Sequence, residues 1–313
     1  MSGFTLSGGL AFSGGFTFTE APSENTASWF AGGTPGSSPL STVDRITYAT
    51  DTATASVRGP LSSVRSSLAA AGNTTDGWFG GGTPGGSTVD RITYATDTNT
   101  ASVRGPLSLA RQGLAAAGNT DYGWFGGGGF PSTSTVDRIT YATDTATASV
   151  RGPLSAARYN FAATGNTTDG WFGGGGGGAA GPLSTVDRIT YATDTATASV
   201  RCPLSLGKVR LAAAGNSDYG WFGAGYNAGT HSTVERITYA TDTATASVRG
   251  PLSGVRRDLA AAGNSTDGWF GGGQTPTMST VDRITYATDT ATASVRGPLS
   301  SARYGLAAAG GMQ

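Results

Sequence analysis

The chain is poor in the residues on which metal centres and many catalytic centres depend. It contains one histidine, His231, and one cysteine, Cys202, among 313 residues. A single cysteine excludes a disulfide within the chain, and clustered His and Cys ligands for a metal are missing. Its acidic residues recur at fixed repeat positions and do not form an asymmetric group. The sequence therefore predicts no catalytic residues, no cofactor site and no metal site.

An excess of one charge and long apolar runs are also missing. The chain has 20 Lys and Arg and 20 Asp and Glu, so its formal net charge is zero. Without a basic patch, nucleic acid is a poor partner. No apolar run approaches the ~20 residues of a membrane span, and the first 20 residues contain no Lys or Arg, so the basic region of a secretory signal is absent. We expect no nucleic-acid partner, no membrane insertion and no signal-dependent export.

Glycine is abundant, with 51 residues, which by itself is typical of disordered chains. Here, however, the glycines recur at fixed places in a tandem repeat that also carries Trp, Phe, Ile, Tyr, Val and Leu. One acidic position, which follows a valine in every copy, recurs every 46 to 50 residues, at Asp44, Asp90, Asp137, Asp187, Glu235 and Asp282. A period of this size is typical of β-propeller blades.

One copy of the repeat divides into four strand-sized segments, residues 68–72, 77–81, 88–96 and 100–104. The first contains only small residues after its leucine, as suits the strand nearest a crowded axis. The second carries Trp and Phe before a glycine run, the third alternates in the manner of a two-sided strand, and the fourth is rich in Thr and Ser, as an outer edge facing water can be.

The two ends of the chain complement each other. Residues 27–33 hold a Trp-Phe strand with no small-residue strand before it, and residues 306–310 hold a small-residue strand with no Trp-Phe strand after it. Pairing them completes a sixth blade and removes the open edges. We therefore predict an all-β, six-bladed propeller over residues 25–313, closed by pairing of its N-terminal and C-terminal strands. Residues 1–24 are predicted to be an attachment segment.

The order of residues in each blade resembles the kelch repeat. Arg65, Leu68, the sequence Trp78-Phe79-Gly80-Gly81 and Tyr94 match that family's order and spacing. The late tryptophan of the family is missing, with Val103 near its place, so the blades are kelch-like and divergent. The resemblance covers residues 25–310 and implies the propeller fold without specifying a function.

Comparison of the six copies places most variation in two segments. One is the loop after the glycines, at residues 34–40, 83–86, 128–133, 175–183, 226–231 and 274–278. The other is the stretch around the third arginine of the repeat, at residues 63–67, 109–113, 156–160, 206–210, 254–258 and 301–305. In a four-stranded meander both segments emerge on one face of the propeller.

This variable face is either a product of neutral drift in exposed loops or a binding surface. Aromatic and charged residues that occur only in these segments are of the kind that grips a sugar or a protein. As candidate binding residues we identify Phe130, Tyr159, Tyr226, His231, Arg257 and Tyr304.

The near-identical copies of the phrase from Asp-Arg-Ile-Thr-Tyr to Arg-Gly-Pro-Leu-Ser also resemble tandem-repeat structural and tail-associated proteins of marine phages, notably cyanophages. The resemblance implies a non-enzymatic virion protein that assembles in the host cytoplasm. Its partners would be other virion proteins, reached through residues 1–24, and a host cell-surface glycan or protein. It would act as a host-attachment appendage or as a decoration of the particle.

Two other classes of function remain as alternatives. A glycan-processing enzyme of the sialidase-like propeller type needs converging arginines with carboxylates and Ser-x-Asp-x-Gly-x-x-Trp boxes, and no such box occurs. An intracellular kelch-type adaptor would carry a fused partner domain. We interpret the repeated arginines as members of structural ion pairs, with Asp44–Arg45 and Asp51–Arg58 as the expected pairs.

Overall fold

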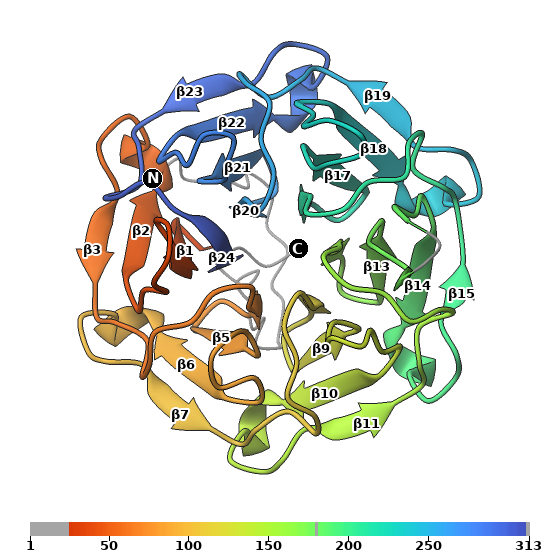
Figure 1. Ribbon diagram of the computed structural model, residues 1–313, viewed down its shortest axis with the longest axis horizontal. Helices are drawn as coiled ribbons and strands as arrows, with labels where there is room; N and C mark the ends of the chain where they lie inside the picture. Colours follow the sequence, from red (N-terminus) through yellow and green to blue (C-terminus); the bar gives the residue numbers. More distant parts are fainter. Residues whose placement is uncertain (1–24, 179–180, 311–313) are drawn as a thin grey trace, which may run out of the picture.

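Six four-stranded antiparallel sheets surround a central axis in the computed structural model, which describes residues 25–178 and 181–310 (Figure 1). The predicted all-β, six-bladed propeller is confirmed. Blade 1 contains strands β24, β1, β2 and β3 in that order, and blades 2 to 6 contain β4–β7, β8–β11, β12–β15, β16–β19 and β20–β23. The predicted attachment segment, residues 1–24, lies outside the described residues.

Each blade runs outward from the axis. The innermost strands are β24 (Tyr304–Ala309), β4 (Ala69–Gly72), β8 (Ala115–Gly118), β12 (Ala162–Gly165), β16 (Ala212–Gly215) and β20 (Ala260–Gly263). The second strands are β1 (Ala27–Thr34), β5 (Asp76–Gly80), β9 (Tyr122–Gly126), β13 (Asp169–Gly173), β17 (Tyr219–Gly223) and β21 (Asp267–Gly271).

The outer half of each blade is equally regular. The third strands are β2 (Val43–Thr47), β6 (Val89–Thr93), β10 (Val136–Thr140), β14 (Val186–Thr190), β18 (Val234–Thr238) and β22 (Val281–Thr285). The outermost strands are β3 (Ser56–Arg58), β7 (Ser102–Arg104), β11 (Ser149–Arg151), β15 (Ser199–Val200), β19 (Ser247–Arg249) and β23 (Ser294–Arg296). After each third strand comes one 3-10 turn: η1 (Tyr48–Thr50), η2 (Tyr94–Thr96), η3 (Tyr141–Thr143), η5 (Tyr191–Thr193), η6 (Tyr239–Thr241) or η7 (Tyr286–Thr288).

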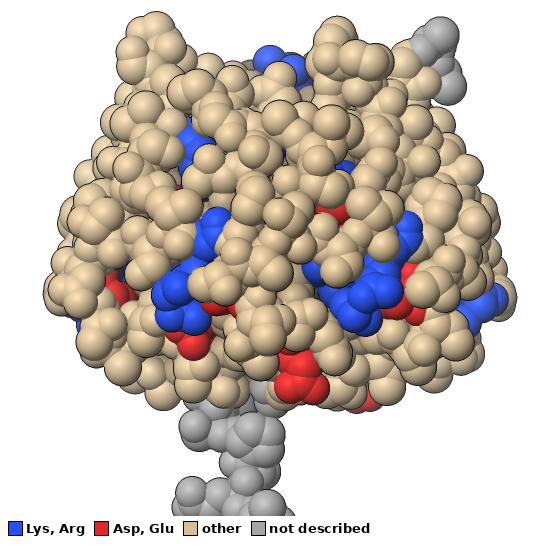
Figure 2. Space-filling view, turned by 90° about the horizontal axis from the view of Figure 1, so that it is seen from below, with Lys and Arg blue, Asp and Glu red and all other residues tan. Residues whose placement is uncertain are grey.

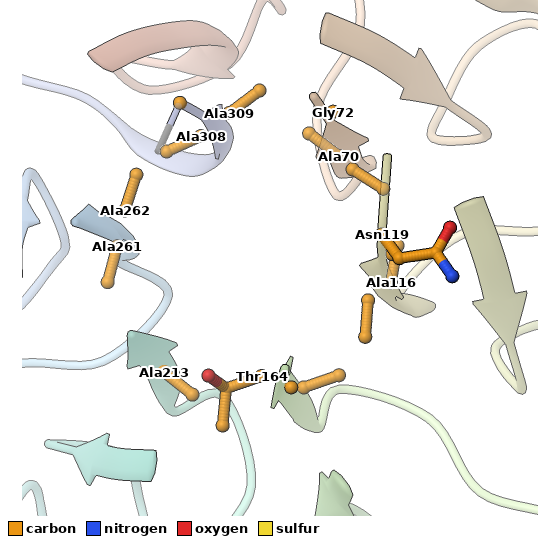
Figure 3. A pocket seen from close by; sticks show the side chains of 16 residues that line it. Ala70, Gly72, Ala116, Asn119, Thr164, Ala213, Ala261, Ala262, Ala308 and Ala309 are labelled. Atoms are coloured by element: carbon orange, nitrogen blue, oxygen red, sulfur yellow. The ribbon is translucent and has the colours of Figure 1, made fainter. Parts of the chain in front are cut away.

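The innermost strands meet around the axis, and their alanines leave only a narrow space of about 80 Å³ between them (Figure 3). The side chains of Ala70, Ala116, Ala213, Ala261 and Ala308 line it from five blades. Because six strands converge there, larger side chains at these positions would have no room. The small-residue strand of the repeat is therefore a packing requirement of the axis.

Neighbouring blades are joined by an aromatic stack. Trp78 of blade 2 lies parallel to Tyr141 of blade 3, with ring centroids 3.7 Å apart. Its indole Nε1 also donates a hydrogen bond of 2.9 Å to Asp144 of blade 3. The same pair and the same hydrogen bond recur at the other five junctions, with centroids 3.7–4.0 Å apart. A buried Trp thus fills the junction while its polar N–H is satisfied.

The third strand is shorter than the sequence predicted. We expected it to cover residues 88–96, whereas β6 ends at Thr93 and Tyr94 begins the turn η2. The chain turns there because Tyr94 stacks on Trp29 of blade 1. Its hydroxyl fills the space where a Cβ on Gly77 would lie, 2.8 Å away, which explains the glycine before each of the later tryptophans.

The predicted pairing of charges was wrong, although the arginines do form structural ion pairs. Asp44 bonds to Arg303 at 3.1 Å rather than to Arg45, and Asp51 pairs with Arg283 and Arg296 of blade 6 rather than with Arg58. Adjacent residues of a strand point to opposite faces, so Asp44 and Arg45 cannot meet. The turn that carries Asp51 reaches to the neighbouring blade.

Two kinds of ion pair result. Arg65 and Asp90 represent the first: both side chains are fully buried within blade 2, with 2.6 Å between Nη2 and Oδ2. The second kind lies on the side wall, where Asp97 of blade 2 accepts a hydrogen bond from Arg45 of blade 1 and forms an ion pair with Arg58 of the same blade. Figure 2 shows these side-wall pairs as adjoining blue and red clusters around the ring.

Closure follows the prediction. Strand β1 pairs with β24 from Trp29 opposite Ala309 to Thr34 opposite Tyr304. The first and last described strands therefore share one sheet, and blade 1 has the same four-strand order as the others.

Candidate functional site

The variable loops lie on one face of the ring, which we call the upper face; the opposite face, with the 3-10 turns, is the lower face. At the centre of the upper face six backbones form a closed ring of hydrogen bonds, each N–H donating to the carbonyl of the preceding blade at 2.6–2.8 Å. The residues of this axial ring are Ser67, Gly113, Asn160, Arg210, Asp258 and Gly305. All six have a positive φ of 53–65°. Their side chains are not used by the ring, so residues of different types can occupy it.

The two variable segments of a blade lie side by side, as the meander predicts. Tyr159 forms a β-bridge with Gly176, Val209 with Tyr226, and Arg257 with Gln274. The upper face is thus a set of short paired loops around the axial ring, and Figure 2 shows loops projecting from the upper edge of the molecule.

Two of the candidate binding residues form one pocket. Phe130 of blade 3 is 82% exposed and meets Tyr159 of blade 4 edge to face, with ring centroids 5.7 Å apart. Together with Gln112, Asn160 and Arg210 they line a cavity of about 330 Å³ beside the axial ring. Its size is typical of a small-ligand site, and it combines aromatic rings with amides and a guanidinium.

Three other candidates form a second, separate cluster. The guanidinium of Arg257 lies over the Tyr226 ring at 4.9 Å. His231 Nε2 is 3.2 Å from the Asn227 carbonyl oxygen of its own loop. These contacts join residues of the cluster to one another, and the histidine stabilises the conformation of its loop.

The sixth candidate stands apart from both groups. Tyr304 belongs to β24, and its hydroxyl donates to the Gly36 carbonyl at 3.2 Å. The six candidates therefore occupy three places on the upper face. Of these residues, Phe130 and Tyr159 line a cavity together.

The sequence interpretation missed the charged pair beside that cavity. Arg210 and Asp258 are neighbours in the axial ring, with 3.2 Å between Nη1 and Oδ2. Burial raises the pKa of Asp258, while Arg210 and a hydrogen bond from Gln274 oppose that rise. The signal was present in the sequence, because the ring position holds five residue types across the six copies.

It also missed two grooves on the lower face. One lies between blades 2 and 3 and the other between blades 4 and 5, and each has a volume of about 450 Å³. Their walls carry the same residues, with Asp76, Arg91 and Tyr122 in the first matched by Asp169, Arg188 and Tyr219 in the second. The signal was the aspartate of the sequence Thr-Asp-Gly-Trp in blades 2 and 4, where blades 3 and 5 carry a tyrosine whose ring packs on an arginine of its own blade.

Within residues 25–178 and 181–310, no three His, Cys, Asp or Glu side chains gather in a way that could hold a metal ion. No helix in this part of the chain has the length and apolar character needed to cross a membrane.

Comparisons with known proteins establish the fold alone. No protein family model and no curated protein sequence matches this chain. Among the solved structures that match, one described as "Structure of YjhT" has a TM-score of 0.66 at 11% sequence identity, covering 80% of this chain and 88% of that one. Identity at this level carries the shape and not the chemistry. By its architecture, the chain is a six-bladed β-propeller.

Proposed function

We propose that the protein is a non-enzymatic binding protein that presents its upper face to a glycan or a protein on a cell surface. The observation that carries this proposal is the cavity lined by Phe130 and Tyr159, which forms where the repeats differ from one another. An aromatic pair with polar groups around it is suited to holding the apolar face and the hydroxyls of a sugar or a protein side chain.

The residues that repeat in all six blades, which we call the frame, are distinct from the variable loops, and this division supports a binding role. Frame residues repeat in all six blades, so groups of the same kind surround the axis at equal intervals. An enzyme needs several different groups converging on one reacting atom. The upper face instead offers several separate contacts of moderate size, an arrangement that gains strength when many copies act together.

We further propose that the ring is kelch-like and belongs to a phage particle. The resemblance of its repeats to tail-associated proteins of marine phages supports this assignment. Residues 1–24 would attach the ring to other virion proteins, and the upper face would contact the host. Detection of the chain by mass spectrometry in purified particles tests the assignment, and its absence from them would contradict it.

The binding role is tested by removing the aromatic pair. A multimerised propeller with Phe130→Ala and Tyr159→Ala should lose most of its adsorption to host cells, because both rings line the cavity and neither belongs to the frame. Replacing all the upper loops with the short loop of residues 83–86 should have the same effect. Unchanged adsorption by either correctly folded variant would overturn the proposal.

A matched control is available on the same face. Tyr226→Ala with Arg257→Ala removes an aromatic and a charged residue from the separate cluster. Adsorption that falls equally in this control and in the Phe130 and Tyr159 variant would point to a diffuse surface rather than to the cavity.

A further inference from the structure

We infer that three alternate junctions of the ring are equivalent binding sites for a tetrahedral oxyanion, that is, a sulfate or phosphate group. The inference is independent of the proposed function, because the sites lie on the side wall and share no residue with the upper face. It begins from a difference between the blades in the residue two positions before the tryptophan. This residue is aspartate in blades 2, 4 and 6, tyrosine in blades 3 and 5, and alanine in blade 1.

All six junctions share one arrangement of charges. Two arginines of one blade approach a single oxygen of the aspartate that follows the 3-10 turn of the next blade. At the junction of blades 3 and 4, Arg138 Nη1 lies 3.0 Å and Arg151 Nε lies 3.5 Å from Asp194 Oδ2. The same three residue types meet at the other five junctions. Two positive charges therefore face one negative charge in this arrangement.

Further acids balance the charge at three of the junctions. Asp76 of blade 2 lies 3.6 Å from Arg91 Nε, and the equivalent aspartates of blades 4 and 6 approach their arginines to 3.5 Å. The grooves between blades 2 and 3 and between blades 4 and 5 also contain an exposed acid, Asp121 or Asp218. At these three junctions, which we call the acid-bearing junctions, the acids equal or outnumber the arginines.

The other three junctions lack this balance. In blade 3, Tyr122 stands at the position of Asp76, and the guanidinium of Arg138 lies over its ring at 4.4 Å. Blade 5 repeats this contact at 4.4 Å, and blade 1 has the small Ala27 at the same position. Among the described residues, two arginines thus face one carboxylate at the junctions of blades 1 and 2, 3 and 4, and 5 and 6. We call these the arginine-rich junctions.

Each arginine pair offers donors that the frame does not use. A guanidinium has five N–H groups, and among the described residues the side chains of Arg138 and Arg151 donate one hydrogen bond, from Arg138 to Asp194. These two side chains are 20% and 21% exposed, and Figure 2 shows arginine atoms at the surface of the side wall. Because both guanidinium groups approach the same carboxylate oxygen, one anion with several oxygens can reach both.

The chemistry of this pair favours a tetrahedral oxyanion. A planar guanidinium forms charge-assisted hydrogen bonds to the oxygen pairs of a sulfate or phosphate group. A doubly negative group also compensates the excess positive charge of an arginine-rich junction, whereas the additional carboxylates of an acid-bearing junction repel it. The ring therefore contains three sites and, between them, three junctions of similar structure that should not bind.

The six indole N–H groups report on the junctions separately, because each donates to the carboxylate oxygen that the two arginines approach. The experiment follows their NMR signals while sodium sulfate, or in a second titration sodium phosphate, replaces sodium chloride at constant ionic strength. The signals of the arginine-rich junctions should shift with a dissociation constant on the order of 10 mM, since the sites are partly exposed to water. These signals belong to Trp29, Trp124 and Trp221.

The signals of the acid-bearing junctions, from Trp78, Trp171 and Trp269, should stay in place. The absence of a selective shift at about 100 mM sulfate, where such a site is nearly saturated, would overturn the inference. Acetate is the control for anion type, because it has a single charge and two oxygens. Shifts of equal size with acetate would overturn the assignment to a tetrahedral oxyanion.

The chain supplies its own matched variants. Tyr122→Asp places beside Arg138 the acid that blades 2, 4 and 6 carry, so the blade should fold normally while the excess charge is cancelled. This variant should abolish the shift of Trp124 and leave that of Trp221. Tyr122→Phe, which keeps the ring and adds no charge, should leave both shifts unchanged. A Trp124 shift that persists in the folded Tyr122→Asp variant would contradict the site.

Two further variants test the opposite change and the need for both arginines. Asp267→Tyr gives the junction of blades 6 and 1 the residues of an arginine-rich junction, so the signal of Trp269 should now respond to sulfate. Arg151→Gln should weaken the site reported by Trp124 by about tenfold or more, because it removes a charged donor. An unresponsive Trp269 in the first folded variant, or unchanged affinity in the second, would contradict the assignment.

The source of the group is distinguished by concentration. Three sites around one ring allow a polysaccharide that carries many sulfate groups to bind through more than one of them. If dextran sulfate produces the selective shifts at a tenfold lower concentration of sulfate groups than inorganic sulfate, the ligand is a group carried by a polymer. Equal concentrations would support the sites as sites for the free ion. Shifts of all six signals together would indicate non-specific association and overturn the inference.

Discussion

The two faces of the ring hold neighbouring blades together in different ways. On the lower face and side wall the contacts pass through side chains, as where Asp144 of blade 3 accepts hydrogen bonds from Trp78 and Arg91 of blade 2 and forms an ion pair with Arg104. At the centre of the upper face they pass through backbone groups, in the axial ring from Ser67 to Gly305. Side-chain contacts require particular residues, whereas backbone hydrogen bonds form with almost any. This difference explains why the repeats agree on one face and vary on the other.

Opening the ring should have the largest effect, because closure is a single contact on which both faces depend. Deleting residues 1–33 removes most of β1, leaving β2 and β24 with unpaired edges. We expect the variant to aggregate and to lose cooperative melting. Size-exclusion chromatography measures the aggregation, and thermal unfolding measures the cooperativity. Deletion of residues 1–20 is the control that spares β1. An unchanged melting curve for the longer deletion would show that closure contributes nothing.

Breaking a buried pair of the frame should have the next largest effect. Arg158→Met leaves Asp187 fully buried without its ion-pair partner, which should lower the free energy of unfolding by about 3–5 kcal/mol. Urea denaturation of the variant and the parent protein measures the difference. A loss below about 1 kcal/mol, which is typical of exposed ion pairs, would mean that water reaches Asp187.

The chain also contains a natural exchange of this pair. In blade 5 Lys208 meets Glu235 at 2.8 Å, so a shorter base is matched by a longer acid. We expect Arg158→Lys and Asp187→Glu each to destabilise the protein, and the double variant to recover part of the loss, with a coupling of about 0.5–3 kcal/mol. Strictly additive losses in urea would show that the two changes in blade 5 are unrelated.

Equivalent substitutions on the two faces should differ in their cost. Asp194→Asn weakens the acceptor of Trp124 and removes the charge that pairs with two arginines, at a cost of about 1–3 kcal/mol. Phe130→Ala removes an exposed ring from the upper face, with an effect within about 0.5 kcal/mol. Thermal denaturation of both variants compares them directly. Equal losses would contradict the division between side-chain and backbone contacts.

The smallest expected effect is chemical and leaves stability unchanged. Cys202 occupies a position at which the other blades have glycine, and it is completely buried. Burial raises the pKa of its thiol to about 11, so at pH 8 it is almost entirely protonated and unreactive. A disulfide reagent should label the folded protein slowly and the unfolded protein at once. Rapid labelling of the folded protein would show that this part of the frame opens readily.

The architecture could be predicted from the sequence because every blade repeats it. The spacing of the acidic position, from Asp44 to Asp282, indicated the blades, and the complementary ends indicated closure. The candidate binding surfaces were harder to predict. Of the candidate residues, Phe130 and Tyr159 line a cavity together, while the imidazole of His231 bonds to the Asn227 carbonyl of its own loop. Arg210 was overlooked, since its ion-pair partner Asp258 comes from another blade.

The sequence by itself determined the number of blades, the order of strands within them and the face on which the copies differ, because these depend on local pattern and period. The partners of the charged residues were decided only by the tertiary structure. Asp51 and Arg283 are far apart in the chain and meet because the ring closes. The lower-face grooves likewise exist only where two blades lie side by side. Contacts between blades depend on how rigid sheets pack around an axis, and a pattern within one repeat does not contain that geometry.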